Sequence, residues 1–362
     1  MKRKAEYIWK DGTQPTTLMR SKSRVVEISD QPVTINDFPE WGFDGSSTNQ
    51  AAGFNSDCIL RPVSFVPDPT QESGHYLVMC EVFDRDGKPH PTNTRSVLRE
   101  VLVAGSAAQE PFFGFEQEYT LFNMNGRPLG WPETGQPFAQ GPYYCGVGAG
   151  RVAGRELVEA HYQACIEAGL LIYGINAEVM LGQWEFQIGY RGFNEAADAL
   201  KTTDDMGFAT WLLHRLSEDY DISVSYENKP IKGDWNGAGC HANFSTKDMR
   251  DIKTGRSAIE NAISSLEKNH LSHIAIYGHG LSDRLTGAHE TCDIHTFRAG
   301  DSDRGASIRI PVTTSKKGYG YLEDRRPGAN SDPYLVAARI LASVCGIEIE
   351  AFSVTPKESV LV

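Results

Sequence analysis

Runs of apolar residues, separated by turn-forming residues, mark the first 95 positions of the chain. Three of them, SRVVEI (23–28), CILRPVSFV (58–66) and HYLVMCEVF (75–83), are divided by Gly, Pro and Asp, a pattern that predicts strands. The next segment, DRDGKPHPTNTR (84–95), is polar and contains two prolines, which interrupt regular structure. We therefore place a domain boundary near residue 95.

Helical periodicity begins after this boundary. The segment GRELVEAHYQACIEAGL (154–170) is amphipathic, and Gly169 provides a stop at its C-terminal end. Further helices are predicted over residues 194–220, 255–278 and 332–346. Two domains are the natural expectation for 362 residues. Residues 1–95 are thus predicted to form a small β-rich domain, and residues 96–362 a larger α+β domain.

Composition and charge narrow the class of protein. The formal net charge of -12 argues against a surface for nucleic acid or anionic lipid, because either would need a basic patch. Seven cysteines, an odd number without a C-x-x-C motif, predict reduced thiols and a cytoplasmic location rather than a disulfide framework. The chain has no signal-peptide core and no run of about 18 apolar residues, so we expect no membrane span.

Two glutamates in FGFEQEY (113–119) raise the first question of chemistry. Side chains alternate along a strand, so Glu116 and Glu118 are predicted to project from one face and Gln117 from the other. Such a pair can be a polar stripe facing solvent. Here, however, Phe and Tyr residues crowd it, and carboxylates in an apolar setting need a compensating cation.

A second glutamate pair lies in NAEVMLGQWEFQIG (176–189). If Leu181 and Gly182 form the loop between two short strands, Glu178 lies directly opposite Glu185. Like charges in that position destabilise a sheet. Both pairs therefore indicate a hard divalent cation, and oxygen ligands favour Mg²⁺ or Mn²⁺ over zinc.

His241 and Glu323 are weaker candidates for the same site. His241 lies in the glycine-rich segment DWNGAGCHANFS (234–245), where the glycines suggest close approach of the backbone to a ligand. Glu323 stands beside Arg325 and Arg326. Taken singly, the histidine has a structural interpretation, and the glutamate can belong to a surface ion pair of small energetic value.

Arginines gather late in the chain, at positions 284, 298, 304, 309, 325 and 326. Their planar guanidinium groups suit bidentate recognition of carboxylates and phosphates, although any one of them can be ordinary surface charge. Together with a site of several carboxylates, they favour a phosphate-bearing substrate, most simply a nucleoside triphosphate with Mg²⁺.

Familiar motifs for phosphate or zinc are incomplete. No G-x-x-x-x-G-K-[ST] occurs, and GVGAGR (146–151) ends in Arg where G-x-G-x-x-G needs Gly. HETCDIH (289–295) has Asp293 where a zinc-protease motif needs its second histidine. A zinc site that uses Cys292 and His295 stays an alternative without other soft ligands nearby.

The motifs in order resemble a known family. FGFEQEY, NAEVMLGQWEFQIG, KPIKGDWNGAGCHANFS, RLTGAHET, DRGASIRIP and YLEDRRPGANSDP are similar to those of glutamine synthetase of the type II class, as is WGFDGSSTNQAAGFNSDCILRP (41–62). The resemblance runs from about Tyr7 to Asp332. It implies an α+β fold with an N-terminal β-grasp domain (1–95) and a catalytic domain (96–362) built on a curved antiparallel sheet with flanking helices. It also implies active sites between neighbouring subunits of a ring, as in a decamer.

The resemblance implies an activity and a set of site residues. The activity is ATP-dependent ligation of ammonia to L-glutamate through γ-glutamyl phosphate. The implied ligands of two Mg²⁺ or Mn²⁺ ions are Glu118, Glu178 and Glu185 for one and Glu116, His241 and Glu323 for the other. Asp44 and Asp57 match ammonium-site residues from the adjacent subunit, Glu290 matches a flap residue, and Arg304 matches the residue at the transferring phosphoryl group. Substrate contacts are implied for Asn236, Gly237, Arg284 and Arg325, and ATP contacts for Phe112, Ser245, Arg309 and Tyr321.

Three positions depart from the family pattern, and three other functions compete with the one that the resemblance implies. Gly150, Ala153 and Leu181 stand where many relatives carry Asp, an aromatic residue and Pro, but none of them is a matched ligand. The rivals are a ligase for another amine, a guanidino phosphotransferase and an inactive structural relative. The matched ammonium-site residues favour ammonia, the FDGSS stretch disfavours the phosphotransferase, and the six intact ligand positions disfavour the inactive relative.

Overall fold

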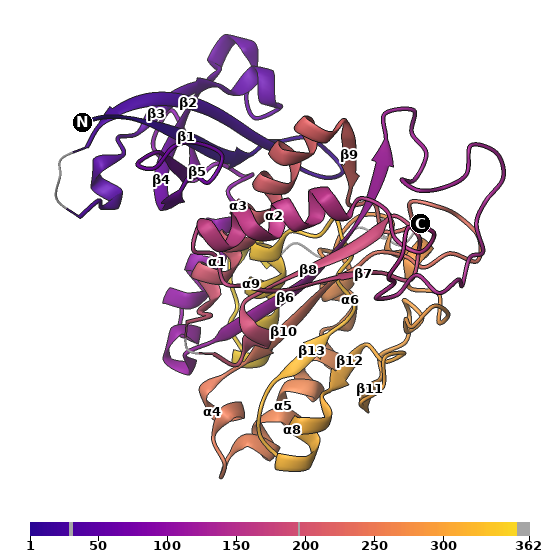
Figure 1. The fold of residues 1–362 in the computed structure, drawn as a ribbon. Helices are drawn as coiled ribbons and strands as arrows, with labels where there is room; N and C mark the ends of the chain where they lie inside the picture. Colours follow the sequence, from indigo (N-terminus) through magenta and orange to yellow (C-terminus); the bar gives the residue numbers. More distant parts are fainter. Residues whose placement is uncertain (29–31, 195, 353–362) are drawn as a thin grey trace.

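The computed structural model describes residues 1–28, 32–194 and 196–352, and these ranges contain two sheets (Figure 1). The N-terminal sheet has five strands in the order β2-β1-β5-β4-β3. Their bounds are β1 Lys2–Lys10, β2 Met19–Glu27, β3 Trp41–Asp44, β4 Asp57–Pro67 and β5 Tyr76–Asp84. Only β1 and β5 pair in parallel, at the centre of the sheet. The strands predicted over 23–28, 58–66 and 75–83 are confirmed within a residue or two, except that β2 begins four residues earlier.

The second sheet has eight strands in the described ranges. Seven follow the order β11-β12-β13-β10-β6-β8-β7, and β9 pairs with the far end of β6. The bounds are β6 Phe112–Asn123, β7 Ile172–Ala177, β8 Gln183–Ile188, β9 Ile222–Ser225, β10 Cys240–Ser245, β11 Ala299–Asp301, β12 Ile308–Ile310 and β13 Leu322–Asp324. The long strand β6 has neighbours on both edges, so it organises the sheet. All pairs except β11 with β12 are antiparallel.

Helices form over the four predicted segments and over others that the sequence analysis did not predict. They are α1 Thr94–Val103, α2 Arg155–Glu167, α3 Ala199–Ser217, α4 Lys247–Arg250, α5 Gly255–Lys268, α6 His270–Ile274, α7 Leu281–Arg284, α8 Val312–Lys317 and α9 Pro333–Cys345. Helix α2 ends just before Gly169, as predicted. The segment 255–278 forms two helices rather than one, because the chain turns at Asn269. Of the predicted helix 194–220, residue 195 lies outside the described residues, and α3 begins at Ala199 behind the N-cap Asp198.

Ion pairs join the N-terminal sheet to the helices of the second part. Arg95, in the first turn of α1, donates to Glu81 of β5 at 3.0 Å and to Asp204 of α3 at 2.8 Å. Lys10 at the end of β1 lies 3.0 Å from Asp332, the N-cap of α9. A division at residue 95 thus falls inside the first turn of α1, and this boundary stays a prediction.

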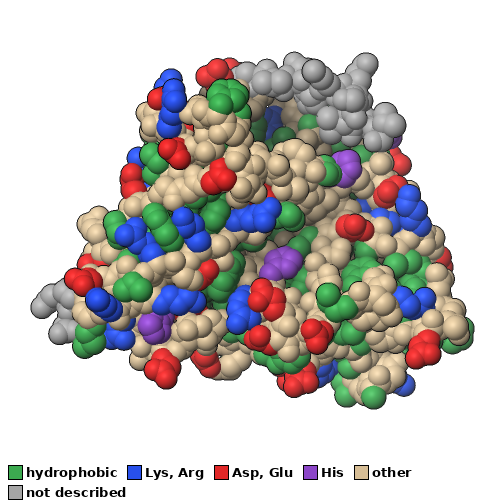
Figure 2. Space-filling view, turned by 90° about the horizontal axis from the view of Figure 1, so that it is seen from above, with side chains coloured by type: hydrophobic (Ala, Val, Ile, Leu, Met, Phe, Trp, Pro, Cys, Tyr) green, Lys and Arg blue, Asp and Glu red, His purple; other side chains and the backbone are tan. Residues whose placement is uncertain are grey.

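Charge is mixed on the face of the molecule seen in Figure 2, where acidic and basic side chains intermingle. None of the helices in the described ranges has the length and apolar character that a membrane crossing requires.

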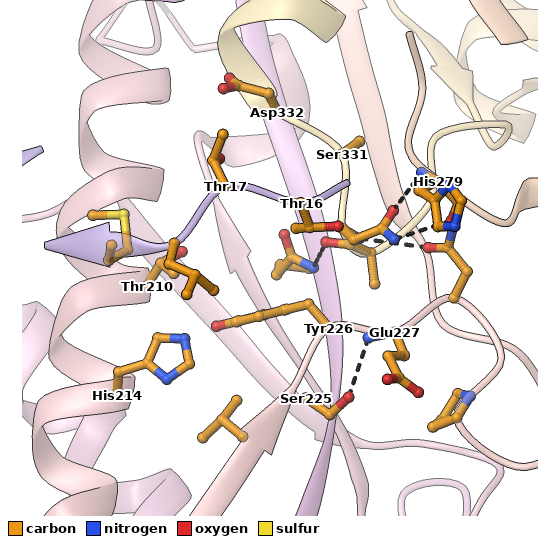
Figure 3. Close-up of a pocket in the computed structure, with 18 of the residues that line it drawn as sticks. Thr16, Thr17, Thr210, His214, Ser225, Tyr226, Glu227, His279, Ser331 and Asp332 are labelled. Carbon is orange, nitrogen blue, oxygen red and sulfur yellow. Dashed lines mark hydrogen bonds between the residues drawn. The ribbon is translucent and has the colours of Figure 1, made fainter. Parts of the chain in front are cut away.

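A cavity of about 900 Å³ lies where the turn between β1 and β2 meets α3 and β9. Figure 3 shows His214 and Tyr226 beside it, with Thr16 and Thr17 from the N-terminal part and Ser331 and Asp332 from the segment before α9. None of the residues singled out from the sequence as site residues lines it. Gln117 does, which confirms that this side chain projects away from Glu116 and Glu118.

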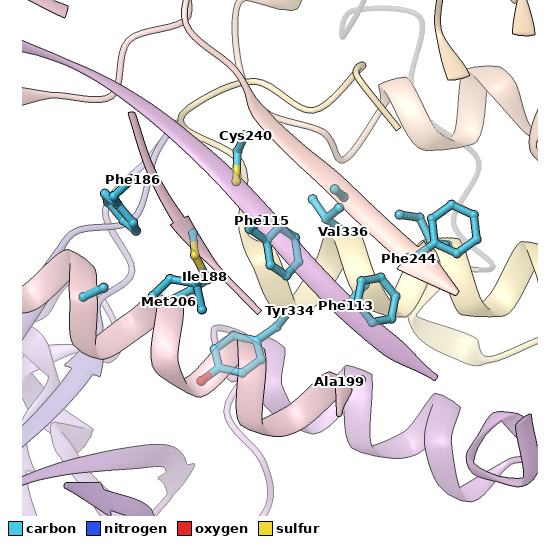
Figure 4. Packing of buried hydrophobic residues seen from close by; sticks show 14 of the residues in the cluster. Phe113, Phe115, Phe186, Ile188, Ala199, Met206, Cys240, Phe244, Tyr334 and Val336 are labelled. Atoms are coloured by element: carbon cyan, nitrogen blue, oxygen red, sulfur yellow. The ribbon is translucent and has the colours of Figure 1, made fainter. Parts of the chain in front are cut away.

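The hydrophobic core covers one face of β6 and leaves the other face to the glutamates. Phe113 and Phe115 point toward the helices, where they pack with Phe186, Ile188, Met206 and Tyr334 (Figure 4). All six side chains are fully or almost fully buried. Because side chains alternate along a strand, their burial commits Glu116 and Glu118 to the opposite face.

Candidate metal and phosphate site

Strand register brings the predicted carboxylates together on the face opposite the core. Glu118 on β6 lies directly opposite Glu185 on β8. Glu116, two residues earlier, lies opposite His241 on β10. Glu323 on β13 pairs with Asn243 of β10. The prediction that Glu116 and Glu118 share one face is confirmed, and four adjacent strands supply the site.

The predicted hairpin register around Glu178 is wrong. The residue opposite Glu185 is Asn176, and β7 ends at Ala177. Glu178 lies in the turn, where its N–H donates to the carbonyl of Gln183 at 2.9 Å. The loop is longer than two residues because Leu-Gly is not a tight-hairpin dipeptide. The register error is two residues, and a shift of two keeps each side chain on its face. Glu178 therefore still reaches Glu185.

Among the described residues, two groups of His, Cys, Asp or Glu side chains have ligand atoms within 4.8 Å of one another. The first is Glu118, Glu178 and Glu185, the set that the resemblance implies for one metal ion. The second is Glu116, Glu185 and His241. It contains two of the three ligands implied for the other ion, with Glu185 in place of Glu323. The remaining implied ligand is close, because Glu323 Oε1 lies 3.6 Å from His241 Nδ1. The division into two ligand sets stays a prediction.

Burial and mutual repulsion keep protons on these carboxyl groups. Burial, with the charge of Glu118 added, raises the pKa of Glu178 to about 8. Burial raises the pKa of Glu118 to about 7, even though nearby arginines oppose the shift. The pKa of Glu185 lies well above its usual range because of burial and the charge of Glu116. Burial, followed by the charge of Arg325, lowers the pKa of His241 far below its ordinary value. Such crowded acids and a neutral imidazole fit a divalent cation with oxygen ligands.

Four of the late arginines border the carboxylates. Arg309 and Arg325 bind the two oxygens of Glu323, at 2.8 and 2.6 Å. Arg284 is buried and donates to Nε2 of His241 at 3.0 Å. Burial lowers its pKa to about 10. The exposed Arg304 accepts a hydrogen bond from Arg325 through its backbone carbonyl and forms a side-chain hydrogen bond with Tyr144.

The other two late arginines serve elsewhere. Arg326, two residues after β13, is buried and binds Asp324 at 2.7 Å. Arg298 pairs with Asp303 at 3.1 Å in a loop. Only part of the late arginine set thus lies beside the carboxylates, and its shared role in binding a substrate stays a prediction.

Buried polar atoms without a hydrogen-bond partner indicate that this site binds a ligand. Nε of Arg309 and Oδ1 of Asn243 are buried without a hydrogen-bond partner in the described part of the chain. Buried polar groups in native proteins are normally paired. Because these two atoms flank Glu323 and Glu116, an ion or an anionic substrate in this place would satisfy them.

The proposed nucleotide contacts lie at one end of the site. Phe112 of β6 pairs directly with Ser245 of β10. Arg250, which the sequence did not single out, lies 3.7 Å above the Phe112 ring and donates to Ser245 Oγ at 2.9 Å. Tyr321 stands next to β13, with its ring 6.3 Å from that of Phe193. The ring and guanidinium groups together suit a base and its phosphates.

The proposed glutamate contacts Asn236 and Gly237 lie in the segment that packs against Arg284. A Cβ on Gly237 would come within 2.8 Å of the Arg284 side chain and 2.7 Å of the Asn228 carbonyl, so only glycine fits there. The Gly237 carbonyl accepts from Gln183 at 2.9 Å, and Asn236 accepts from Gln140 at 3.0 Å. This segment therefore has a fixed backbone beside a buried cation.

Glu290 and the two aspartates differ from the rest in exposure. Glu290 is an exposed loop residue with φ +59, and its carbonyl accepts from Arg325 at 3.4 Å. Asp44 and Asp57 are exposed and face one another across β3 and β4. No hydrogen bond or ion pair within the described ranges joins them to the carboxylate site. Hydroxyl donors, Ser46 and then Ser47, lower the pKa of Asp44 to about 2.

An α+β enzyme with an acidic centre that can hold metal ions, bordered by arginines, is the class that this fold and site define. Residues 1–85 match the model of the glutamine synthetase beta-Grasp domain, and residues 91–276 match that of the glutamine synthetase catalytic domain. The chain belongs to the glutamine synthetase family, and it is an enzyme that makes glutamine from glutamate.

Relatives from distant organisms support this membership over nearly the whole chain. The chain is 53 % identical to a chloroplastic glutamine synthetase of Chlamydomonas reinhardtii, over 94 % of this chain and 90 % of the relative. It is 52 % identical to a glutamine synthetase of Streptomyces viridochromogenes, over 96 % and 98 %. It is 48 % identical to that of Saccharomyces cerevisiae, over 94 % and 89 %. The predicted family and the predicted α+β fold with a β-grasp domain are confirmed.

Proposed function

We propose that this enzyme joins ammonia to L-glutamate with ATP, through γ-glutamyl phosphate, and releases L-glutamine, ADP and phosphate. A carboxylate is a poor acyl donor because its leaving group would be oxide. Transfer of the γ-phosphoryl group of ATP to the side-chain carboxylate of glutamate makes phosphate the leaving group. Ammonia then attacks the acyl carbon, the C–O bond to phosphate breaks, the nitrogen releases a proton, and the amide forms.

The observation that carries the proposal is the meeting of buried carboxylates and arginines on one sheet face. Glu118, Glu178 and Glu185 would hold one divalent ion, and Glu116, His241 and Glu323 the other. When bound, Mg²⁺ or Mn²⁺ would neutralise phosphate charge and align the transfer. Arg304 and Arg309 border this centre and would bind the transferring and neighbouring phosphoryl groups.

Binding of glutamate is proposed for the side of the centre that contains Arg284, Arg325, Asn236 and Gly237. A buried guanidinium suits a carboxylate, and a fixed backbone segment suits the polar groups of an amino acid. Binding of ATP is proposed for the side that contains Phe112, Ser245, Tyr321 and Arg309. The reacting carboxylate and the γ-phosphoryl group would then meet over the carboxylate cluster.

Ammonium must bind and lose a proton before it can attack. Asp44 stays ionised because hydroxyl donors lower its pKa to about 2, and such a carboxylate suits a small cation. In one chain Asp44 and Asp57 lie on the N-terminal sheet, apart from the carboxylate site. We propose that they act in the site of a neighbouring subunit in a ring. From the family resemblance, we also propose that the assembly is a decamer. Glu290 would close over the acyl phosphate and keep water out.

Product analysis tests this proposal. The enzyme is incubated with ATP, Mg²⁺ and L-glutamate, with and without ammonium, and phosphate and glutamine are both quantified. Equal amounts of the two products, formed only with every component present, support the proposal. Turnover with a larger amine but not with ammonium would assign the enzyme to another glutamate ligase. Absence of turnover with any amine, in assembled and metal-loaded protein, would favour the inactive relative.

A further inference from the structure

A strained turn follows β8 directly. Gly189, Tyr190, Arg191 and Gly192 all have positive φ, at +89, +50, +61 and +61°. Residues other than glycine rarely adopt this conformation, and clusters of it occur at functional sites. The turn contains the short helix η5 (Tyr190–Gly192) and rests on β6. A Cβ on Gly114 would lie 2.7 Å from the backbone nitrogen of Arg191.

The turn directs the Arg191 side chain into the carboxylate site. Its Nη1 forms an ion pair with Oε1 of Glu116. Its guanidinium also lies 5.6 Å from the centre of the Tyr173 ring. The side chain is 33 % exposed, whereas that of Glu116 is 10 % exposed. Arg191 thus reaches a buried carboxylate from a position that solvent, or a substrate, can approach.

Arg191 also stands between the metal ligands and the proposed nucleotide contacts. The Ser245 hydroxyl donates to the carbonyl of Gly192, next to Arg191. Tyr321 lies close enough for the charge of Arg191 to influence the pKa of its hydroxyl. A nucleotide that extends from Phe112 and Ser245 to the carboxylates would therefore pass the Arg191 guanidinium.

Charge counting shows why this position matters. The carboxylates of Glu116 and Glu323 are bound by three guanidinium groups, those of Arg191, Arg309 and Arg325. With Glu185, whose ligand atom lies within 4.8 Å of that of Glu116, three carboxyl groups meet three guanidinium groups, so a divalent cation must displace guanidinium donors from the oxygens it binds. Phosphate oxygens would remove the conflict, because they can accept the displaced arginine donors.

We infer that Arg191 is a phosphate-binding residue that exchanges partners. It neutralises Glu116 when no nucleotide is bound, and it donates to a phosphate of the nucleotide when a divalent ion binds Glu116. The inference rests on the proposed use of ATP. It extends that proposal to a residue that the sequence motifs did not indicate.

Binding measurements on assembled protein test the exchange. The variants are Arg191→Gln, Arg191→Lys and, as a matched control, Arg215→Gln, which removes a partly exposed arginine that pairs with Asp219. Calorimetry gives the affinity for the Mn²⁺ complex of a β,γ-imido analogue of ATP. Electron paramagnetic resonance gives the binding of Mn²⁺ alone.

Loss of a charge-assisted contact in Arg191→Gln should weaken binding of the Mn²⁺–nucleotide complex about tenfold or more. Binding of Mn²⁺ alone should be unchanged or tighter, because a competing cation is gone. Arg191→Lys should lie between wild type and Arg191→Gln, and Arg215→Gln should match wild type.

Two results would overturn the inference. If Mn²⁺ alone and the nucleotide complex both weaken in Arg191→Gln, Arg191 only holds Glu116 in place. If neither changes, it does not bind phosphate. Failure of the wild-type enzyme to bind the nucleotide would instead refute the proposed use of ATP. Chromatography and thermal melting confirm assembly, and Arg191→Lys preserves the positive charge if Arg191→Gln does not fold.

Discussion

Glu185 is the residue on which both carboxylate groups depend, because it belongs to each of them. Its side chain is buried, and its charge is opposed by Glu116, Glu118 and Glu178. An isolated buried carboxylate costs stability unless it is neutralised. Glu185 is therefore a poor choice for stability and a good one for binding a divalent cation.

Replacement of Glu185 should separate these two effects. Glu185→Gln keeps the shape but removes a ligand, so glutamine formation should fall by more than about 100-fold, since even residues that only support ligands cost 10–100-fold. Without metal, the variant should melt no lower than wild type because one buried acid is gone. The rise in melting temperature on adding Mn²⁺ should shrink, and a full rise would contradict the assignment. Glu159→Gln, on the exposed face of α2, is the control.

Metal-free protein should lose stability as pH rises. The unfolded chain releases protons from these acids near pH 4.5, whereas folded Glu118 and Glu178 hold them to about 7 and 8. The folded state therefore binds more protons in this window, and the free energy of unfolding falls with increasing pH. Urea denaturation at pH 5.5 and pH 8 in chelator measures this fall. Saturating Mn²⁺ should abolish it, and a pH-independent metal-free stability would refute the pKa shifts.

At the scale of elements, the register of β6 with β8 and β10 does most to build the site. Sequence alternation predicted correctly that Glu116 and Glu118 share a face, because their aromatic neighbours had to be buried. It could not predict which strands pair with β6, since His241 lies more than 120 residues away in sequence. Sequence alternation also could not predict the hairpin register around Glu178, because the loop depends on tertiary contacts of Gly182.

Gly182 should be required for that hairpin. Its φ is +91°, and a Cβ there would lie 2.7 Å from the carbonyl oxygen of Leu129. Gly182→Ala should lower the free energy of unfolding by about 2 kcal/mol or more, through strain and displacement of the turn. It should also weaken Mn²⁺ binding, because Glu178 lies in that turn.

Gly169→Ala is the matched control for Gly182→Ala. Gly169 has φ +72°, but a Cβ there has open space around it. This variant should lose only about 1 kcal/mol and should bind Mn²⁺ normally. Equal loss of metal affinity in the two variants would show that the turn does not position Glu178.

At the scale of the whole molecule, the two sheets divide the proposed site residues between them. The motifs predicted the order of the two parts and each glutamate pair, because those features are local in sequence, and the family resemblance predicted which of these residues meet. Arg191 and Arg250 were missed, since no motif marks them and only the folded sheet brings them to Glu116 and Phe112.

Mixed assemblies should reveal whether sites are shared between subunits. Asp44→Asn and Glu185→Gln are each expected to be inactive as pure assemblies. Suppose that each site takes Asp44 from one subunit and Glu185 from the next. In a random equal mixture each of these residues is intact with a probability of about one-half, so about a quarter of the sites should be restored. Co-expression with two tags and purification of hybrids measures this recovery. Activity no higher than in the pure variants would place both residues in sites of one chain.

Oxygen transfer provides the most direct test of the proposed chemistry. L-Glutamate labelled with ¹⁸O in its side-chain carboxylate is converted with ATP, ammonium and Mg²⁺, and the released phosphate is analysed by mass spectrometry. The acyl phosphate mechanism predicts one labelled oxygen in phosphate for each glutamine formed, because the C–O bond of the former carboxylate breaks. Unlabelled phosphate, formed alongside glutamine, would contradict γ-glutamyl phosphate as the intermediate.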